Sequence, residues 1–109
     1  MKDTVLLVYC TVPTIDEAKT ISRILVDKKL AACCTSLPNA TSIFRWEGNT
    51  EESSETLLLI KSTQKKYEQL EKEIKMIHSY SVPEIIATKI KAGSKAYIDW
   101  IYDCVNEMD

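Results

Sequence analysis

The sequence has few of the residues that interrupt regular structure and few of those that most often carry catalysis. Its 109 residues include 2 glycines, 3 prolines and 1 histidine. This scarcity excludes collagen-like and low-complexity chains, and a hydrophobic content of 45% excludes a disordered one. No apolar run approaches the ~20 residues that a membrane-spanning helix needs. The run Val5 to Val8 is too short for the apolar core of a signal peptide. We therefore expect one domain over residues 1–109, either cytoplasmic or a mature form whose leader was removed, with no membrane partner.

The charge balance argues against a nucleic-acid partner. The formal net charge is −2 and the pI is about 5.4. Proteins that bind nucleic acid usually carry a basic patch that neutralises phosphates, and the bulk charge gives no sign of one. An anionic membrane surface is disfavoured for the same reason.

The four cysteines show no CxxC spacing. Cys33 and Cys34 are adjacent, so on a strand they point to opposite faces and cannot bridge each other without strain. With Cys10 and Cys104 they are expected to be free thiols that behave as small hydrophobic side chains.

Hydrophobic periodicity predicts alternating strands and helices. The nearly continuous apolar run over residues 4–12 predicts a central strand that ends at Pro13. Thr14 to Glu17 is a capping box, in which the Thr14 hydroxyl accepts from the Glu17 amide and the Glu17 side chain reaches back. The helix that it starts is expected to run to about Lys29. The later elements follow in this order: a weak strand over 30–37 with a turn at 38–39, a strand over 41–47, a turn at 48–49, a solvated stretch over 51–55, a central strand over 56–63, a helix over 64–78, a strand over 84–91 and a final helix from Ser94.

The order βαββαβ plus a C-terminal helix is that of the split βαβ fold. It predicts an α+β domain with a four-stranded antiparallel sheet and helices on one face. One C-terminal helix is too small to cover the other face, so we expect the chain to bury it by forming an oligomer.

Several separate segments resemble the CutA family of divalent-cation tolerance proteins. They are Leu30-Ala31-Ala32-Cys33, Thr41-Ser42-Ile43-Phe44-Arg45-Trp46-Glu47-Gly48, His78-Ser79-Tyr80-Ser81-Val82-Pro83-Glu84-Ile85-Ile86 and Tyr97-Ile98-Asp99-Trp100. The resemblance covers essentially the whole chain. It implies a ferredoxin-like subunit in a tight homotrimer, built like the PII signalling proteins, and a link to copper and other divalent cations.

The resemblance also implies candidate metal ligands. Cys10 and His78 match a cysteine and the second of two histidines of a copper site proposed for bacterial members, whereas Ile77 replaces the first histidine and Ser79 a usual proline. The strand before the second helix is taken to run parallel to the first strand, and the helix then runs back over about 20 Å. We therefore expect His78 to lie at the opposite end of the sheet from Cys10, so that one subunit does not ligate an ion through both. The alternative role for His78 is an interaction with the helix dipole.

A second candidate site is a cleft, which the resemblance places between subunits. Its residues lie on loops or strand ends, where ligand sites gather: Trp46, Lys61, Tyr80, Glu84 and Trp100. A lysine, a carboxylate and aromatic rings could together hold a small anion or metabolite. The alternative is that the two tryptophans anchor an interface between subunits.

Catalysis is not expected, because the sequence offers neither a Ser/His/Asp set nor a glycine-rich phosphate loop. Two functions remain open. One is a trimeric protein that binds divalent metal, copper above all, and confers tolerance to it. The other is a PII-like signalling or scaffold trimer that binds a small ligand or a protein partner.

Overall fold

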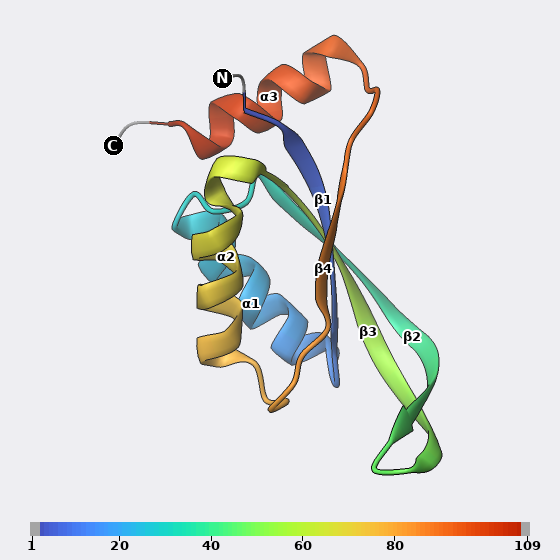
Figure 1. Cartoon of the computed structure of the whole chain (residues 1–109). Coiled ribbons are helices and arrows are strands. Elements are labelled where there is room, and N and C mark those ends of the chain that lie inside the picture. Colours follow the sequence, from blue (N-terminus) through green and yellow to red (C-terminus); the bar gives the residue numbers. More distant parts are fainter. Residues whose placement is uncertain (1–2, 108–109) are drawn as a thin grey trace.

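The apolar run near the N-terminus forms strand β1 (Val5–Val12), which lies inside a four-stranded sheet of order β2-β3-β1-β4. The computed structural model describes residues 3–107 (Figure 1). The remaining elements follow along the chain: α1 (Ile15–Asp27), β2 (Cys33–Trp46), β3 (Asn49–Thr63), α2 (Gln64–Ile77), β4 (Ile85–Lys89) and α3 (Lys95–Val105). Every strand pair is antiparallel, so the ferredoxin-like α+β prediction is confirmed. No helix within residues 3–107 is long and apolar enough to cross a membrane.

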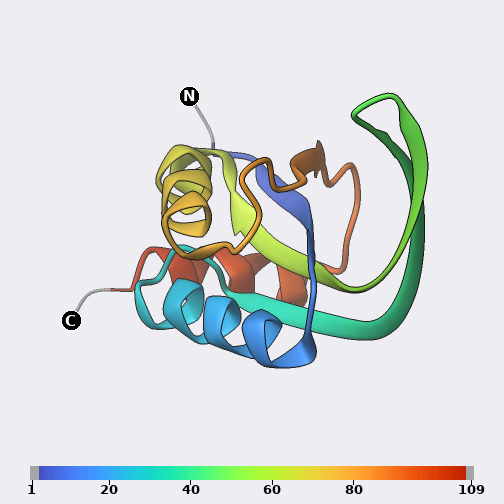
Figure 2. The same cartoon turned by 90° about the horizontal axis from the view of Figure 1, so that it is seen from below.

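The main core lies between one face of the sheet and helices α1 and α2 (Figures 1 and 2). Alternate residues of β1 point toward the helices, because successive side chains of a strand face opposite sides. The buried apolar side chains that α1 and α2 contribute are Ala18, Ile21, Leu25, Leu70 and Ile74. Full burial of one such branched side chain is worth roughly 1.5–3 kcal/mol, so this layer holds the subunit together.

The first helix begins and ends through backbone-specific contacts. The Thr14 hydroxyl accepts from the Glu17 amide at 3.1 Å, which confirms the predicted N-cap. The helix stops at Asp27, slightly before the predicted end, because Lys29 adopts a left-handed conformation with φ of 59°. The amides of Lys29 and Leu30 then bond back to Val26 and Leu25, as in a Schellman motif.

The other face of the sheet is apolar and largely uncovered. Helix α3 packs over only one end of it, where Val5 and Ala32 contact Ile101 and Val105. Beyond α3, the strand register sets apolar side chains side by side on this face: Leu7, Tyr9, Leu37, Leu57, Leu59 and Ile86. Leu37 is 44% exposed and Ile86 57%. The prediction that one C-terminal helix is too small to cover this face is confirmed.

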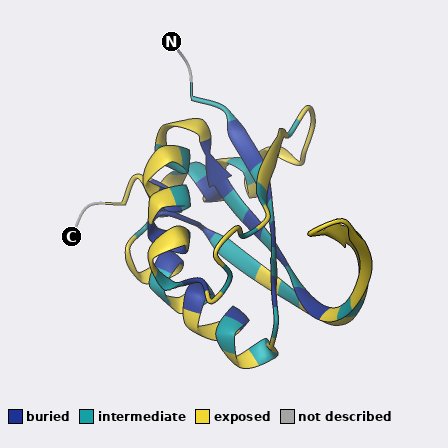
Figure 3. Ribbon diagram, turned by 60° about the horizontal axis from the view of Figure 1, so that its bottom comes forward, coloured by how far each residue is buried: buried dark blue, intermediate teal, exposed yellow. Residues whose placement is uncertain are grey.

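Strands β2 and β3 continue past the sheet as a long hairpin, which we call the arm (residues 40–55). The predicted turn at Pro38 and Asn39 is wrong, because the strand continues through a bulge there. Asn39 adopts a φ of 65°, and β2 is an edge strand, where a proline without an N–H is tolerated. The stretch over 51–55, predicted to be solvated, is part of β3 and pairs with β2; Glu51, Glu52 and Ser54 are exposed as expected, whereas Glu55 is buried. The arm curls away from the helices, and most of its side chains are exposed (Figures 2 and 3).

Candidate functional site

His78 lies beside the end of β1, which corrects the expectation that it lies at the opposite end of the sheet from Cys10. Strands β1 and β3 are antiparallel, with Thr63 opposite Val5. Helix α2 therefore starts near the beginning of β1 and runs back toward its end. The His78 ring nitrogen Nε2 lies 2.8 Å from the backbone carbonyl of Thr11, the residue after Cys10. The error was the assumed parallel direction of β3.

Both ring nitrogens of His78 have protein partners. Nε2–H donates to the Thr11 carbonyl, and Nδ1 accepts from the Tyr80 amide at 3.0 Å. The side chain has no exposed surface, and Nδ1 lies 3.6 Å from the Glu17 carboxylate. A metal needs a free nitrogen lone pair, and this arrangement leaves none. In the folded subunit, His78 ties the loop after α2 to the end of β1.

The Cys10 thiol is also in an unfavourable state for metal binding. Burial, followed by the nearby carboxylates of Glu84, Glu17 and Glu55, raises the pKa of Cys10 to about 12. Copper binds a thiolate, so the bound form requires that this proton be lost. Within residues 3–107, no group of three or more His, Cys, Asp or Glu side chains is arranged to hold a metal. As folded, Cys10 and His78 do not fit a copper ion within one subunit.

Two glutamates fix the loop between α2 and β4. The Glu17 carboxylate does not close the predicted capping box; it accepts from both the amide and the hydroxyl of Ser79, each at 3.0 Å. Tyr80 donates its hydroxyl to Glu55 at 2.9 Å. Burial, followed by this hydrogen bond, raises the pKa of Tyr80 to about 12, so the hydroxyl stays protonated as a donor. Glu55 is only 7% exposed although it sits at the base of the arm.

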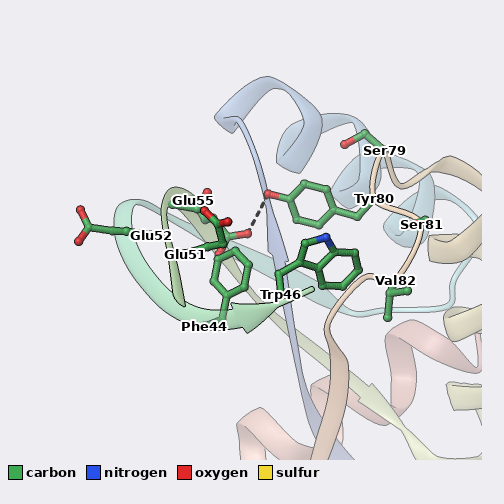
Figure 4. Close-up of a pocket in the computed structure, with 10 residues that line it drawn as sticks. Phe44, Trp46, Glu51, Glu52, Glu55, Ser79, Tyr80, Ser81 and Val82 are labelled. Atoms are coloured by element: carbon green, nitrogen blue, oxygen red, sulfur yellow. Dashed lines mark hydrogen bonds between the residues drawn. The ribbon is translucent and has the colours of Figure 1, made fainter. Parts of the chain in front are cut away.

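A cleft of about 530 Å³ opens between the arm and this loop, and we call it the hairpin cleft (Figure 4). Its lining combines aromatic rings, carboxylates and hydroxyls: Phe44, Trp46, Glu51, Glu52, Ser53, Glu55, Ser79, Tyr80, Ser81 and Val82. A second hollow of about 360 Å³ shares Phe44, Glu55 and Tyr80 with it and adds Glu84.

The structure gathers three of the five predicted cleft residues. Trp46 and Tyr80 line the hairpin cleft, and Glu84 lines the adjoining hollow. The other two, Lys61 on β3 and Trp100 on α3, line neither hollow. Lys61 reaches Thr35 Oγ1 at 2.9 Å, and Trp100 stacks beside Tyr97 with ring centroids 5.5 Å apart.

The acidic part of the cleft was missed by sequence analysis. It consists of Glu51, Glu52 and Glu55, which belong to the stretch that was predicted to be solvated because of its charge. The feature that could have identified Glu55 is its position directly before Thr56, where the apolar run of β3 begins. Because this part of β3 pairs with a neighbouring strand, the Glu55 carboxylate is buried.

Comparisons with known proteins give one consistent result. The family model for "CutA1 divalent ion tolerance protein" matches residues 6–104. A "Divalent-cation tolerance protein CutA" of Thermus thermophilus is 43% identical over 95 residues, covering 87% of this chain and 92% of that protein. "Protein CutA, chloroplastic" of Arabidopsis thaliana is 40% identical over 88% of this chain, which spans only 53% of that longer protein.

Solved structures agree with the sequence comparisons. The crystal structure of CutA from Xylella fastidiosa is 37% identical, with a TM-score of 0.92, and the match covers 94% of this chain and 99% of that one. The antiparallel sheet with its helices is thus shared over nearly the whole chain. The chain belongs to the CutA1 divalent ion tolerance family.

Proposed function

We propose that this chain acts in divalent-cation tolerance as a homotrimer that binds a small ligand or a protein partner, in the manner of a PII-like module, and not as an enzyme. The observation that carries the proposal is the apolar sheet face that the helices leave uncovered. The number of subunits follows from the resemblance to the CutA family.

The uncovered face has the composition of an interface. Its centre is Tyr9, which pairs with Leu59 on one side and with Ile86 on the other. Contiguous exposed apolar surface of this kind marks a contact with another molecule. In a closed ring of three copies each subunit can turn this face toward the common axis, so self-association buries it on every subunit.

The two candidate metal ligands, His78 and Cys10, are also poorly placed for catalysis. His78 has both nitrogens engaged, and the raised pKa of Cys10 removes the thiolate that a nucleophile needs. Neither group has the state that acid–base or nucleophilic catalysis requires.

Native mass spectrometry of the protein and of Leu59→Glu tests the assembly. We expect a trimer for the parent chain and loss of the trimer in the variant, because a carboxylate in the middle of the apolar face cannot be buried without a partner. Gln69→Glu adds the same charge on the exposed side of α2 and serves as the matched control. A parent chain that is monomeric at micromolar concentration would overturn the proposal.

Copper binding through Cys10 and His78 is the second candidate function. The observation that favours it is that His78 lies at the same end of β1 as Cys10, within 2.8 Å of the Thr11 carbonyl. Binding there requires the thiol to lose its proton and the imidazole to leave Thr11, or a ligand from a neighbouring subunit.

Metal titration separates the two candidates. If copper binds at this place, Cys10→Ser and His78→Asn each lower the number of ions bound per trimer, and Cys104→Ser on α3 leaves it unchanged. If the protein is a ligand-binding trimer without this metal site, all three variants bind copper as the parent does.

A further inference from the structure

We propose that the hairpin cleft binds a small organic cation, an alkylammonium or guanidinium compound, between its aromatic rings and the Glu55 carboxylate. The inference rests on the proposed ligand-binding function and names the ligand's chemical class.

The charge of the cleft selects a cation. Its described lining contains the carboxylates of Glu51, Glu52 and Glu55, and the adjoining hollow adds Glu84. No lysine, arginine or histidine is among the described residues that line either hollow. An anion would meet like charge with no cationic side chain to compensate it, because Lys61, the lysine of the expected site for a small anion or metabolite, lines neither hollow.

The aromatic rings suit an organic cation. Figure 4 shows the rings of Phe44, Trp46 and Tyr80 gathered beside Glu55, whereas Glu52 points away from them. Trp46 is 47% exposed and Phe44 42%, so their faces are open to a ligand. The electron-rich face of an aromatic ring attracts an ammonium or guanidinium group, and tryptophan does so most strongly.

Glu55 is built into the site and is not a solvated surface acid. It is only 7% exposed, and the Tyr80 hydroxyl holds its Oε2 at 2.9 Å. Such a fixed carboxylate pairs with a cation at little cost in side-chain entropy, because its rotamer is already set.

Size and ligand set argue against a bare divalent ion here. Calcium takes six to eight oxygen ligands, and magnesium requires close octahedral geometry. No such cluster of acidic, cysteine or histidine side chains exists among residues 3–107. A volume of about 530 Å³ is instead that of a small-molecule site.

The test is isothermal titration calorimetry of the full chain with choline as the cationic probe and 3,3-dimethylbutan-1-ol, its uncharged analogue, as the control ligand. We expect choline to bind and the alcohol to bind at least about tenfold more weakly, because only the cation gains from the rings and from Glu55. Propionate and Mg²⁺ are titrated alongside as the anionic and divalent alternatives.

Three variants locate the site. Trp46→Leu and Glu55→Gln should each weaken choline binding by about tenfold or more. Trp100→Leu, which removes a tryptophan of similar exposure on α3, should leave it unchanged. Trp46 is half exposed, so its variant keeps the test valid even if the buried Glu55→Gln change unfolds the protein.

Four results would overturn the inference: no choline binding by the folded protein, equal binding of the alcohol, tighter binding of propionate or Mg²⁺, or unchanged binding in Trp46→Leu. Choline would fail to bind, for example, if a lysine or arginine side chain of another copy filled the cleft. Native mass spectrometry of the same samples keeps the two proposals apart. A trimer that rejects choline but binds another ligand refutes only the cation, whereas a monomer refutes the trimer.

Discussion

The buried Cys10 thiol predicts a specific loss of stability at alkaline pH. Its pKa is raised from an ordinary 9.0 to about 12, chiefly by burial. Above pH 9 the unfolded chain loses the Cys10 proton while the folded chain keeps it, so folding must take a proton up. The stabilisation is complete below pH 9 and is lost as pH rises toward 12. Each pH unit in this window costs about 1.4 kcal/mol, which gives about 2 kcal/mol at pH ~10.5 and about 4 kcal/mol in all.

The assay compares the parent chain with Cys10→Ala by urea unfolding at about pH 8 and about pH 10.5. The alanine substitution costs the same packing free energy at both pH values. The difference in unfolding free energy between the two proteins therefore changes with pH only through ionisation of Cys10. We expect the advantage of the parent chain to fall by about 2 kcal/mol between the two pH values. Cys34, whose pKa burial raises to about 11, and Tyr80 titrate in both proteins and cancel. Protein concentration is held constant, because the proposed assembly would contribute to stability.

A difference that does not change with pH would refute the reasoning. It would mean that the Cys10 thiol ionises in the folded protein as readily as in the unfolded chain. The thiol would then give up its proton to a bound metal at only its ordinary cost, and the second candidate function would gain support.

Three further substitutions test separate parts of the structure by chemical denaturation. Tyr80→Phe removes the donor to the buried Glu55 carboxylate and should cost about 1–3 kcal/mol; an unchanged midpoint would show that water replaces the phenol. Thr14→Ala removes the acceptor of the Glu17 amide and should cost about 1 kcal/mol, whereas Thr14→Ser should cost little; equal losses would contradict the cap. Ile74→Ala opens the fully buried layer under α2 and should cost roughly 2–5 kcal/mol; a loss below 1 kcal/mol would mean that the layer closes around the gap.

Sequence reasoning predicted the fold well where periodicity and caps agree. The capping box at Thr14 and the apolar run of β1 identified their elements because each depends on a few neighbouring residues. The turn predicted at Pro38 and Asn39 was wrong, because a proline ends a central strand but not an edge strand. Whether a strand lies at the edge of the sheet depends on the tertiary structure, which the local sequence does not give.

The site was harder to predict than the fold. The sequence singled out His78 and Cys10, but one mistaken strand direction put them at opposite ends of the sheet. Their hydrogen bonds and burial, which decide whether they can bind a metal, exist only after packing. Glu55 escaped notice because an acid beside other acids is usually solvated, and only its pairing in β3 and the Tyr80 hydroxyl bury it.

The arm has a consequence for how assembly and binding are related. A two-stranded ribbon is at best marginally stable in water on its own, and the arm of a lone subunit has mostly exposed side chains on both strands. We therefore expect the amide protons of residues 40–55 to exchange rapidly with solvent in dissociated subunits and slowly once neighbouring copies hold the arm. Because Phe44 and Trp46 form one wall of the hairpin cleft, we expect that wall to become rigid only in the proposed trimer. By reciprocity, any molecule that fills the cleft favours the assembled state, so the protein's oligomerisation equilibrium should report the concentration of its ligand.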